Sequence, residues 1–233
     1  MRILTYTVTP EEDGRMVKGI LRGSLQLSYT LLKSLKWREN AILLNGQSVH
    51  VNAIVHAGDV VSVALSERTP REDLYCANAA KPDIVYEDDD LLVLNKPAGI
   101  AMHPKSGDAS ASSLAAMLTS YLGEGSVPHF VSRLDKGTSG LLIAAKNGYV
   151  HDRLRRALHS SDLRREYRAV AVGRVEPPCG VIDAPIGRAE GSIIRRCVRA
   201  DGLPSLTEYE TLQVNDRFTL LRLRPQTGRT HQL

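Results

Sequence analysis

Short apolar runs interrupted by turn residues dominate the chain after residue 82, and they constrain its fold most strongly. Each run is bounded by Gly, Pro, Asn or Asp: IVYEDDDLLVLNKP, FVSRL, LLIAAKN, YRAVAVGRV and FTLLRLRP. Runs of this length and punctuation predict short β-strands. Helical spacing appears at SSLAAMLTSYL and HDRLRRALHSS, so strands and helices do not alternate regularly. We therefore predict an α+β domain with a central mixed, mostly antiparallel sheet rather than a doubly wound fold.

The composition is that of a globular protein, with 233 residues of which 42% are apolar and 24% charged. No run approaches the roughly 20 apolar residues needed to cross a bilayer. The opening MRILTYTVTPEED is too polar and acidic for a secretory signal. Cys76, Cys179 and Cys197 are odd in number and form no CxxC pair. This argues against a disulfide framework or a zinc ribbon and fits a reducing compartment. We therefore expect the protein to be cytoplasmic and not to bind a membrane.

Charge is distributed unevenly along the chain, although the formal net charge is only +4. Residues 15–38 contain six basic residues and no acidic one: Arg15, Lys18, Arg22, Lys33, Lys36 and Arg38. Residues 66–90 contain eight acids and three bases. The start of this second stretch has two prolines and weak apolar periodicity, which is typical of a linker. We predict a small domain over 1–66, a linker over 67–82 and a larger domain over 83–233.

The first domain combines a basic helix with a small hairpin. Leu27, Leu31, Leu32 and Leu35 have helical spacing, with Lys33 and Lys36 on the flanks. AILLNGQSVHVN predicts two short strands around an Asn-Gly turn at residues 45–46, and VVSVAL predicts another strand. Such a unit can lie against an RNA backbone, or it can be a solvated cap domain.

The string RLDKGTSGLLIAAKN, residues 133–147, is the most informative in the chain. An apolar lead-in ends at Leu134, a polar turn holds Asp135 to Gly140, and a strand follows. Gly137 and Gly140 permit positive φ, so a tight turn can present Asp135 at a strand end. Taken alone, Asp-Lys-Gly is an ordinary β-turn. Oxygen ligands at alternate positions are missing, which argues against a calcium loop.

As a whole, this string resembles the catalytic signature of the RluA-class pseudouridine synthases, which convert selected uridines of ribosomal or transfer RNA to pseudouridine. Ser132 stands where that family usually has His. The matching positions are Arg133, Leu134, Asp135, Thr138, Ser139, Gly140 and Leu141.

Four further segments resemble the family's segments in the same order: LLVLNKPAGIAMHP, REYRAVAVGRV, IDAPIGR and LRPQTGRTHQL. The second contains the family's active-site tyrosine, here Tyr167, and the fourth contains its basic residue, here Arg229. The resemblance spans 83–233 and implies the pseudouridine synthase fold. Family members continue beyond the last motif, so we expect the catalytic domain to be incomplete at Leu233.

The N-terminal domain resembles a degenerate S4-type RNA-binding domain. LLNGQSV and HAGDVVSV match its hairpin and following strand, whereas Gly14-Arg15-Met16-Val17 replaces the usual Arg-Leu-Asp opening. The resemblance implies that Lys33, Lys36 and Arg38 contact RNA.

Pseudouridine formation breaks the C1′–N1 bond, turns the uracil and rejoins it through C5. Because nothing is oxidised and no group is donated, we expect no cofactor. Asp135 can add to the sugar as a nucleophile or remove its 2′ proton as a base. Tyr167 can stack on the flipped base, or it is a core tyrosine. Arg229 can pair with Asp135 or contact phosphate, or it is an exposed turn arginine.

Further RNA contacts are assigned by the same resemblance. Arg133 fills the gap left by the flipped base, unless it forms a surface ion pair, and Leu134 joins it at the substrate. The run 151–168 holds six arginines and three acids, so it is either a backbone-binding face or a solvated helix. His151 and His159 lie eight residues apart with no third ligand nearby, so we expect no metal site.

The predicted function is therefore an RNA pseudouridine synthase, acting as a monomer on ribosomal or transfer RNA. Two other classes stay open. The chain can be an RNA-binding assembly factor without turnover, as Ser132 would permit. It can also be a nucleosidase that uses Asp135 for hydrolysis and releases uracil.

Overall fold

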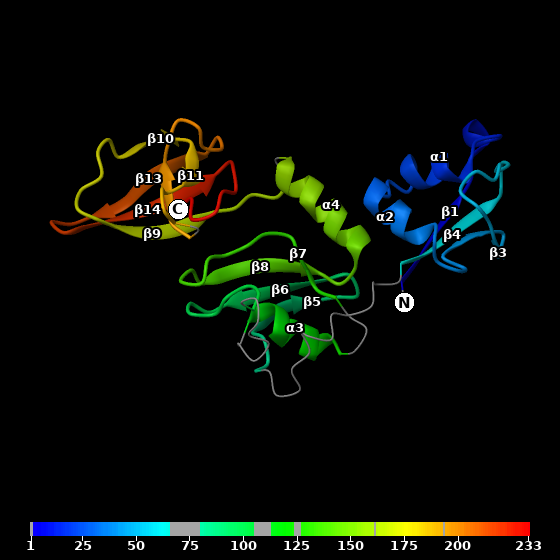
Figure 1. Ribbon diagram of the computed structural model, residues 1–233, viewed down its shortest axis with the longest axis horizontal. Coiled ribbons are helices and arrows are strands. Elements are labelled where there is room, and N and C mark those ends of the chain that lie inside the picture. The colour runs from blue at the N-terminus through cyan, green and yellow to red at the C-terminus, as the bar shows by residue number, and fades with distance from the viewer. Residues whose placement is uncertain (1, 66–79, 105–112, 124–126, 161, 193) are drawn as a thin grey trace. The chain divides into compact units, whose positions relative to one another are not determined.

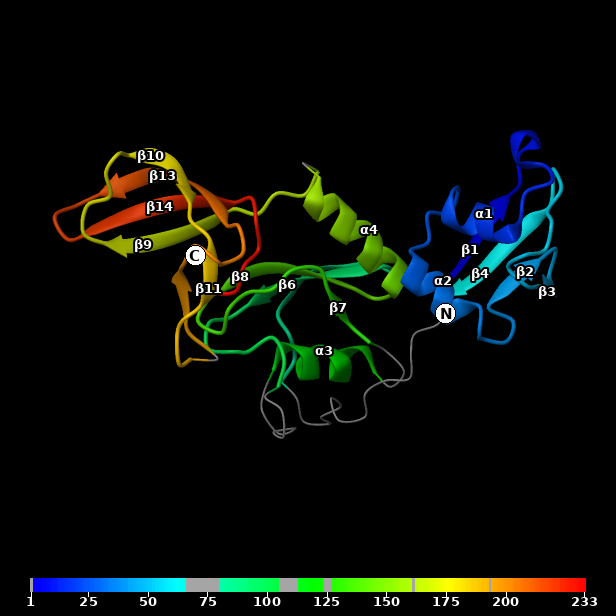
Figure 2. The same cartoon turned by 45° about the horizontal axis from the view of Figure 1, so that its top comes forward.

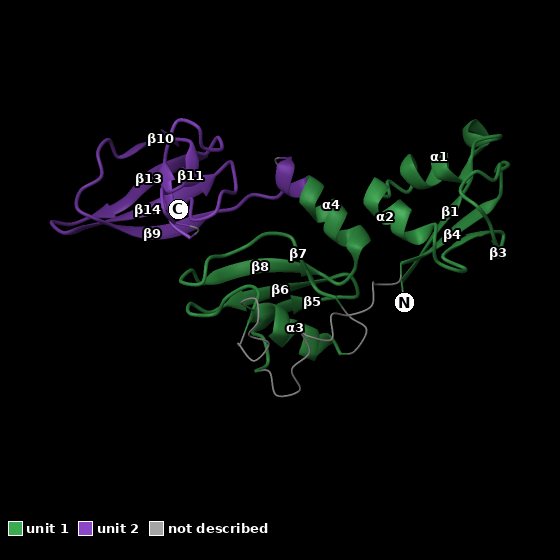
Figure 3. Cartoon of the chain, viewed as in Figure 1, with its two compact units in different colours: residues 1–156 green, residues 157–233 purple. Residues whose placement is uncertain are grey.

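The computed structural model describes residues 2–65, 80–104, 113–123, 127–160, 162–192 and 194–233. The chain divides into two compact units, residues 1–156 and 157–233 (Figure 3). The division falls inside helix α4 (Gly148–His159). Unit 1 contains two separate four-stranded sheets, and unit 2 contains one four-stranded sheet and a two-stranded ribbon.

The first sheet of unit 1 has the order β1-β4-β2-β3, and all its pairs are antiparallel. Its strands are β1 (Arg2–Thr7), β2 (Ile42–Leu44), β3 (Gln47–Ser48) and β4 (Val60–Leu65). Asn45 and Gly46 join β2 to β3 with φ of 50° and 82°. Two consecutive positive φ angles are typical of a type I′ turn, so the predicted Asn-Gly hairpin is confirmed.

Two short helices, α1 (Val17–Arg22) and α2 (Tyr29–Leu35), share a core with this sheet. The Ser28 hydroxyl caps α2 by accepting a hydrogen bond from the Leu31 amide at 3.3 Å. Leu32 and Leu35 are buried in that core, which confirms the predicted helix. Leu27 is also buried, but it precedes the helix.

A buried carboxylate holds the N-terminal turn, which contains the 3₁₀ helix η1 (Pro10–Glu12). Glu12 is buried and accepts hydrogen bonds from the hydroxyl groups of Ser24 and Tyr6 and from the Thr9 amide. The bonds from Ser24 and Tyr6 lower the pKa of Glu12 below its ordinary value. The sequence around Glu12 did not predict these hydrogen bonds.

The second sheet of unit 1 has the antiparallel order β5-β6-β8-β7. Its strands are β5 (Ile84–Glu87), β6 (Leu91–Lys96), β7 (His129–Phe130) and β8 (Gly140–Ala145). Helix α3 (Leu114–Leu122) lies against one face of this sheet and α4 lies on the side away from it (Figures 1 and 2). Both helices occur where the apolar spacing predicted them. Residues 114–119 of α3 are all buried.

Unit 2 is built on the antiparallel sheet β10-β13-β14-β9. Its strands are β9 (Tyr167–Val172), β10 (Cys179–Asp183), β13 (Leu206–Val214) and β14 (Phe218–Pro225). A separate ribbon pairs β11 (Ile186–Arg188) with β12 (Arg196–Val198). Successive side chains alternate between sheet faces, so Tyr167, Leu221 and Leu223 share one face, whereas Arg222 and Arg224 lie on the other.

The observed architecture differs from the predicted one in two respects. The strands after residue 82 form two four-stranded sheets instead of one central sheet, and every named strand pair is antiparallel rather than mixed. Apolar runs indicate where strands lie, but strand partners depend on contacts between distant residues that no local pattern contains. The predicted domain boundaries stay a prediction, because most of the linker, including Cys76, lies outside the described residues.

Three findings bear on the other structural expectations. Cys179 and Cys197 are free thiols. Over the ranges that the structure describes, no helix combines the length and apolar character that a membrane crossing requires. In the same ranges, no three His, Cys, Asp or Glu side chains come together as metal ligands would.

Candidate active site

Asp135 lies on a turn that leads directly into strand β8. The Thr138 amide donates a hydrogen bond to the Asp135 carbonyl at 3.0 Å, which closes the turn. Gly140 begins β8 with φ of 130°, whereas Gly137 does not use the positive φ that the sequence permits. The Asp135 side chain is exposed, so its carboxylate is open to a substrate.

The side chain before it has the opposite environment. Leu134 is only 6% exposed, and this burial supports a role in anchoring the turn more than a surface contact with RNA. Arg133 is exposed next to it, which is compatible with the predicted contact. Ser132, in the position of the family's usual His, is half-buried.

Lys96 holds the turn from inside unit 1. Its side chain has no exposed surface, and its Nζ donates to the carbonyls of Pro97 at 2.9 Å, Thr138 at 2.7 Å and Lys136 at 3.3 Å. The Gly99 amide donates to the same Lys136 carbonyl at 2.7 Å. Residues 96–99 and 135–140 are therefore fastened together through the main chain. We call residues 135–140 the Asp135 turn.

Electrostatics connects Lys96 to Asp135. Burial lowers the pKa of Lys96, because the charged ammonium has lost its water, and the negative charge of Asp135 opposes that shift. The Asn-Lys-Pro string at residues 95–97 did not predict a role for Lys96. The only signal in the sequence was that a lysine ended a strand whose first four residues are apolar.

Tyr167 opens strand β9 in unit 2. It stands opposite Leu223 in the β14–β9 pair, on the face that also buries Leu221 and Leu223. Its side chain is half-buried. The Tyr167 ring is therefore partly packed and partly available for stacking. This placement agrees both with stacking on a flipped base and with a role in the core.

Arg229 lies on a loop after β14 that is fixed by one amide side chain. Gln232 accepts hydrogen bonds from the Arg229 amide at 2.9 Å and from the Thr227 hydroxyl at 3.0 Å. Its own amide group donates to the Leu206 carbonyl at 3.1 Å and to the Thr207 hydroxyl at 2.9 Å. We call residues 226–232 the Arg229 loop. The Arg229 guanidinium donates to the Pro204 carbonyl at 2.8 Å.

Arg165 connects this loop to the start of β9. Its guanidinium donates to the carbonyls of Pro225 at 3.4 Å and Thr227 at 3.3 Å. Tyr167 and Arg229 thus belong to neighbouring segments of unit 2, whereas Asp135 belongs to unit 1. Sequence reasoning missed both Arg165 and Gln232, although both lie inside quoted motifs.

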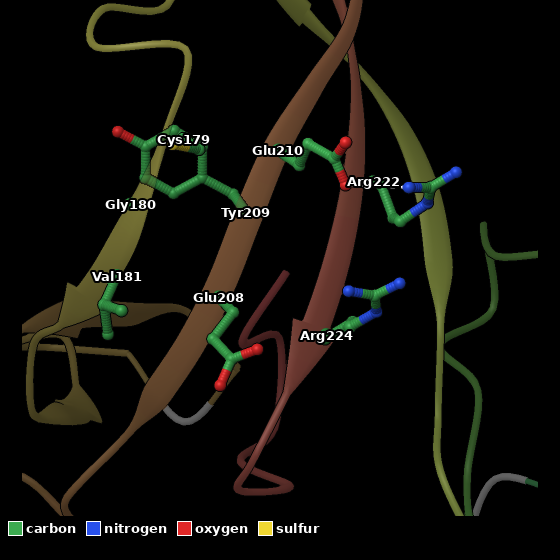
Figure 4. A pocket seen from close by; sticks show the side chains of 8 residues that line it. All are labelled: Cys179, Gly180, Val181, Glu208, Tyr209, Glu210, Arg222 and Arg224. Carbon is green, nitrogen blue, oxygen red and sulfur yellow. Dashed lines mark hydrogen bonds and ion pairs between the residues drawn. The ribbon is translucent and has the colours of Figure 1, made fainter.

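A shallow pocket of about 240 Å³ lies on the sheet face of unit 2 that is opposite Tyr167 (Figure 4). Its charged lining is largely neutralised internally, because Arg222 pairs with Glu210 at 2.7 Å and Arg224 with Glu166 at 3.0 Å. Cys179 and Tyr209 line it as well. None of the predicted catalytic residues lines this pocket, so it is not a candidate for the reaction centre.

The basic residues that were predicted to contact RNA differ in their exposure to solvent. Lys33 and Lys36 are exposed, and Arg38 is half-buried. Two arginines of the basic run 151–168 form hydrogen bonds within unit 1. Arg153 of α4 donates to the side-chain oxygen of Gln26 at 3.4 Å, and Arg156 donates to the Gln26 carbonyl at 3.3 Å. Arg156 also pairs with Asp152 at 2.7 Å. These two arginines therefore have structural partners of their own.

Known proteins are similar to this chain over most of its length. The RNA pseudouridylate synthase family profile matches residues 90–233. RNA pseudouridine synthase YjbO of Bacillus subtilis (strain 168) is 35% identical over 213 residues, covering 91% of this chain and 75% of that protein. Ribosomal large subunit pseudouridine synthase D of Vibrio parahaemolyticus is 35% identical over 236 residues, covering 99% of this chain and 71% of that protein.

A solved structure supports the fold. Human RNA Pseudouridylate Synthase Domain Containing 1 matches with a TM-score of 0.52 and 27% identity, covering 65% of this chain and 62% of that one. The chain thus spans less than two thirds of the length of that human structure. The predicted resemblance to pseudouridine synthases is confirmed. The chain belongs to the RNA pseudouridylate synthase family, a family of isomerases.

Proposed function

We propose that this protein isomerises uridine to pseudouridine in ribosomal RNA, with transfer RNA as the other candidate substrate. The family membership supports the reaction, and the name of the Vibrio relative supports the ribosomal substrate. We further propose that it acts as a monomer in the cytoplasm. No cofactor is needed, because the reaction is a balanced rearrangement: the C1′–N1 bond breaks, a C1′–C5 bond forms, the C5 proton leaves, and N1 gains a proton.

The exposed carboxylate of Asp135, on a turn fixed by a fully buried ammonium, is the observation that carries this proposal. A group that must meet the sugar of a flipped nucleotide has to be both accessible and held in place. Asp135 meets both requirements. It acts either as a nucleophile on C1′ or as a base at the 2′ position.

Tyr167, Arg229 and Arg133 complete the proposed machinery. Tyr167 stacks on the extruded uracil, since flipping a base costs a few kcal/mol that stacking offsets. Arg229 supports the reacting carboxylate or a phosphate, and Arg133 takes the place that the flipped base leaves. In the N-terminal domain, which we propose to be S4-like, Lys33, Lys36 and Arg38 contribute salt-dependent affinity for the RNA backbone.

The test is the substitution Asp135→Asn, which keeps the shape of the side chain and removes its charge. Because the C5 proton is released, tritium release from RNA labelled with [5-³H]uridine measures turnover directly. We expect a loss of at least about 10³-fold with RNA binding retained, as for other reacting groups. Asp89→Asn is the matched control, since Asp89 is an exposed aspartate on the β5–β6 turn, and it should keep full activity.

Three outcomes would contradict the proposal. Undiminished turnover by Asp135→Asn would remove Asp135 from the reaction. Release of free uracil would make the protein a hydrolase. Tight binding of ribosomal RNA without any pseudouridine would favour the assembly factor.

A further inference from the structure

Two aromatic side chains stand out on the surface of the N-terminal domain. Tyr29, at the start of α2, is 68% exposed, and Trp37, just after its end, is 79% exposed. Leu32 and Leu35 are the residues of α2 that are buried in the core. The Tyr29 and Trp37 rings are therefore not needed to form the core, because other residues of α2 already pack against it.

A cation lies over one face of each ring. The Arg22 guanidinium carbon lies 5.9 Å from the centroid of Tyr29, and Lys36 Nζ lies 5.0 Å from the centroid of Trp37. Lys33 is exposed one helical turn after Tyr29, so it follows the same side of α2. No acidic residue occurs between Arg15 and Arg38. The surface thus combines two exposed aromatic rings with the exposed positive charges of Arg22, Lys33 and Lys36.

This combination is complementary to single-stranded nucleic acid. Proteins that bind single strands pair a positively charged track for phosphates with aromatic rings on which bases stack. A duplex hides the faces of its bases and offers mainly phosphates and groove edges. Tyr29 opens α2 and Trp37 follows its end, so the two rings lie at the two ends of this seven-residue helix.

We propose that Tyr29 and Trp37 form a stacking platform for unpaired bases of the RNA substrate, beside phosphates held by Arg22, Lys33 and Lys36. The inference rests on the proposed function only in that the bound molecule is RNA. It narrows the substrate to RNA with an accessible single-stranded segment. It also adds base contacts to a domain for which the sequence predicted only contacts with the backbone.

Trp37 is the only tryptophan of the chain, so its fluorescence reports directly on this platform. The full chain is titrated with a 12-nucleotide oligo(U), with a blunt RNA duplex of equal charge, and with heparin. We expect oligo(U) to quench the emission and the duplex and heparin to bind with little quenching. Equal quenching by heparin would overturn the proposal, because heparin carries charge and has no bases.

Substitutions then separate stacking from charge. Trp37→Ala and Tyr29→Ala should each weaken oligo(U) binding about tenfold without changing the dependence of affinity on salt. Trp37→Phe should keep most of the affinity, whereas Lys33→Ala should reduce the salt slope. The matched control is Tyr86→Ala, which removes a tyrosine that is 52% exposed but is hydrogen-bonded to Asp88, and it should bind normally. Normal binding by Trp37→Ala would overturn the platform.

The isomerisation assay distinguishes failure of this inference from failure of the proposed function. We expect Trp37→Ala to raise KM about tenfold on structured RNA and to leave kcat unchanged. Quenching by oligo(U) without any isomerisation would support the platform and refute the synthase. Isomerisation with an unchanged KM in Trp37→Ala would support the synthase and refute the platform. A blue shift with anionic phosphatidylglycerol vesicles, with no response to RNA, would identify a membrane-binding face and also refute it.

Discussion

The Asp135 turn of unit 1 and the Arg229 loop of unit 2 both carry predicted catalytic side chains, but they are held in different ways. One charged group, the buried Lys96 ammonium, fixes the Asp135 turn through carbonyls. Two polar groups share the work at the Arg229 loop, namely the amide of Gln232 and the guanidinium of Arg165.

Because the two segments are held differently, we expect them to respond differently when one contact is removed. Hydrogen bonds from an ion are roughly twice as strong as neutral ones, and they gain strength where water is excluded. The Asp135 turn therefore depends mainly on Lys96, with the Gly99 amide as a weaker second attachment. The Arg229 loop is held more weakly at each point, but it keeps a second attachment when one is removed.

The largest effect is expected from Lys96→Met, which keeps the buried volume and removes the ammonium. Three carbonyls lose the ammonium, although the Lys136 carbonyl keeps the Gly99 amide as a donor, so the free energy of unfolding should fall by about 2–4 kcal/mol. Turnover should fall by at least about 100-fold, because a misplaced reacting group is costly. Urea unfolding and tritium release measure the two effects.

Lys136→Met is the matched control for stability, since the Lys136 side chain is exposed and only its carbonyl is used. It should stay within about 0.5 kcal/mol of the unsubstituted protein. If Lys96→Met were equally stable, the ammonium would not be what fixes the turn.

A smaller effect is expected from Gln232→Ala. The Arg229 loop then loses its amide bonds but keeps Arg165, so unit 2 should lose about 1–2 kcal/mol and turnover should fall about tenfold. Gln213→Ala, an exposed glutamine on β13, should change neither.

Combining Gln232→Ala with Arg165→Ala tests whether the two attachments act together. The double variant should lose more turnover than the product of the single losses, because among the described residues the loop then keeps only its bonds to Pro204, Leu206 and Glu208. Strictly multiplicative effects would show that the two residues act independently.

The smallest effect concerns alkaline pH, and it should appear only in the Asp135 turn. The pKa of Lys96 is lowered in the folded chain, so between that pKa and its ordinary value of 10.5 the unfolded chain binds more protons. The Lys96 contribution to stability therefore increases as pH rises through this window. Urea unfolding at successive pH values should show the increase in the unsubstituted protein and not in Lys96→Met.

Asp135→Asn sharpens this test. It removes the negative charge that raises the pKa of Lys96, so the increase should begin at a lower pH. An unchanged onset would mean that the two groups are not electrostatically coupled. Gln232→Ala should keep the pH profile of the unsubstituted protein, since it leaves Lys96 and Asp135 unchanged.

The sequence predicted those parts of the molecule that local patterns determine. The hairpin at Asn45-Gly46, the helix ending at Leu35 and the turn at Asp135 follow from turn chemistry and apolar spacing, and all are observed. Strand β1 was not predicted, because its pairing with β4 connects residues nearly sixty positions apart.

The supporting residues of the site could not be predicted for a similar reason. Lys96 and the Thr138 carbonyl are 42 positions apart, and Gln232 reaches Leu206 from 26 positions away. A lysine in a sequence normally indicates a solvated surface. Only the folded sheet, in which Lys96 stands opposite Gly140, turns that side chain inward.

The contacts that fix the Asp135 turn all end on main-chain oxygen atoms, those of Pro97, Lys136 and Thr138. None of them requires a particular side chain at positions 136 or 138. Those two positions are therefore suited to combinatorial mutagenesis: the two residues that follow Asp135 most closely, apart from Gly137, can be exchanged to retarget the enzyme to other RNAs, while Lys96 keeps the backbone in place.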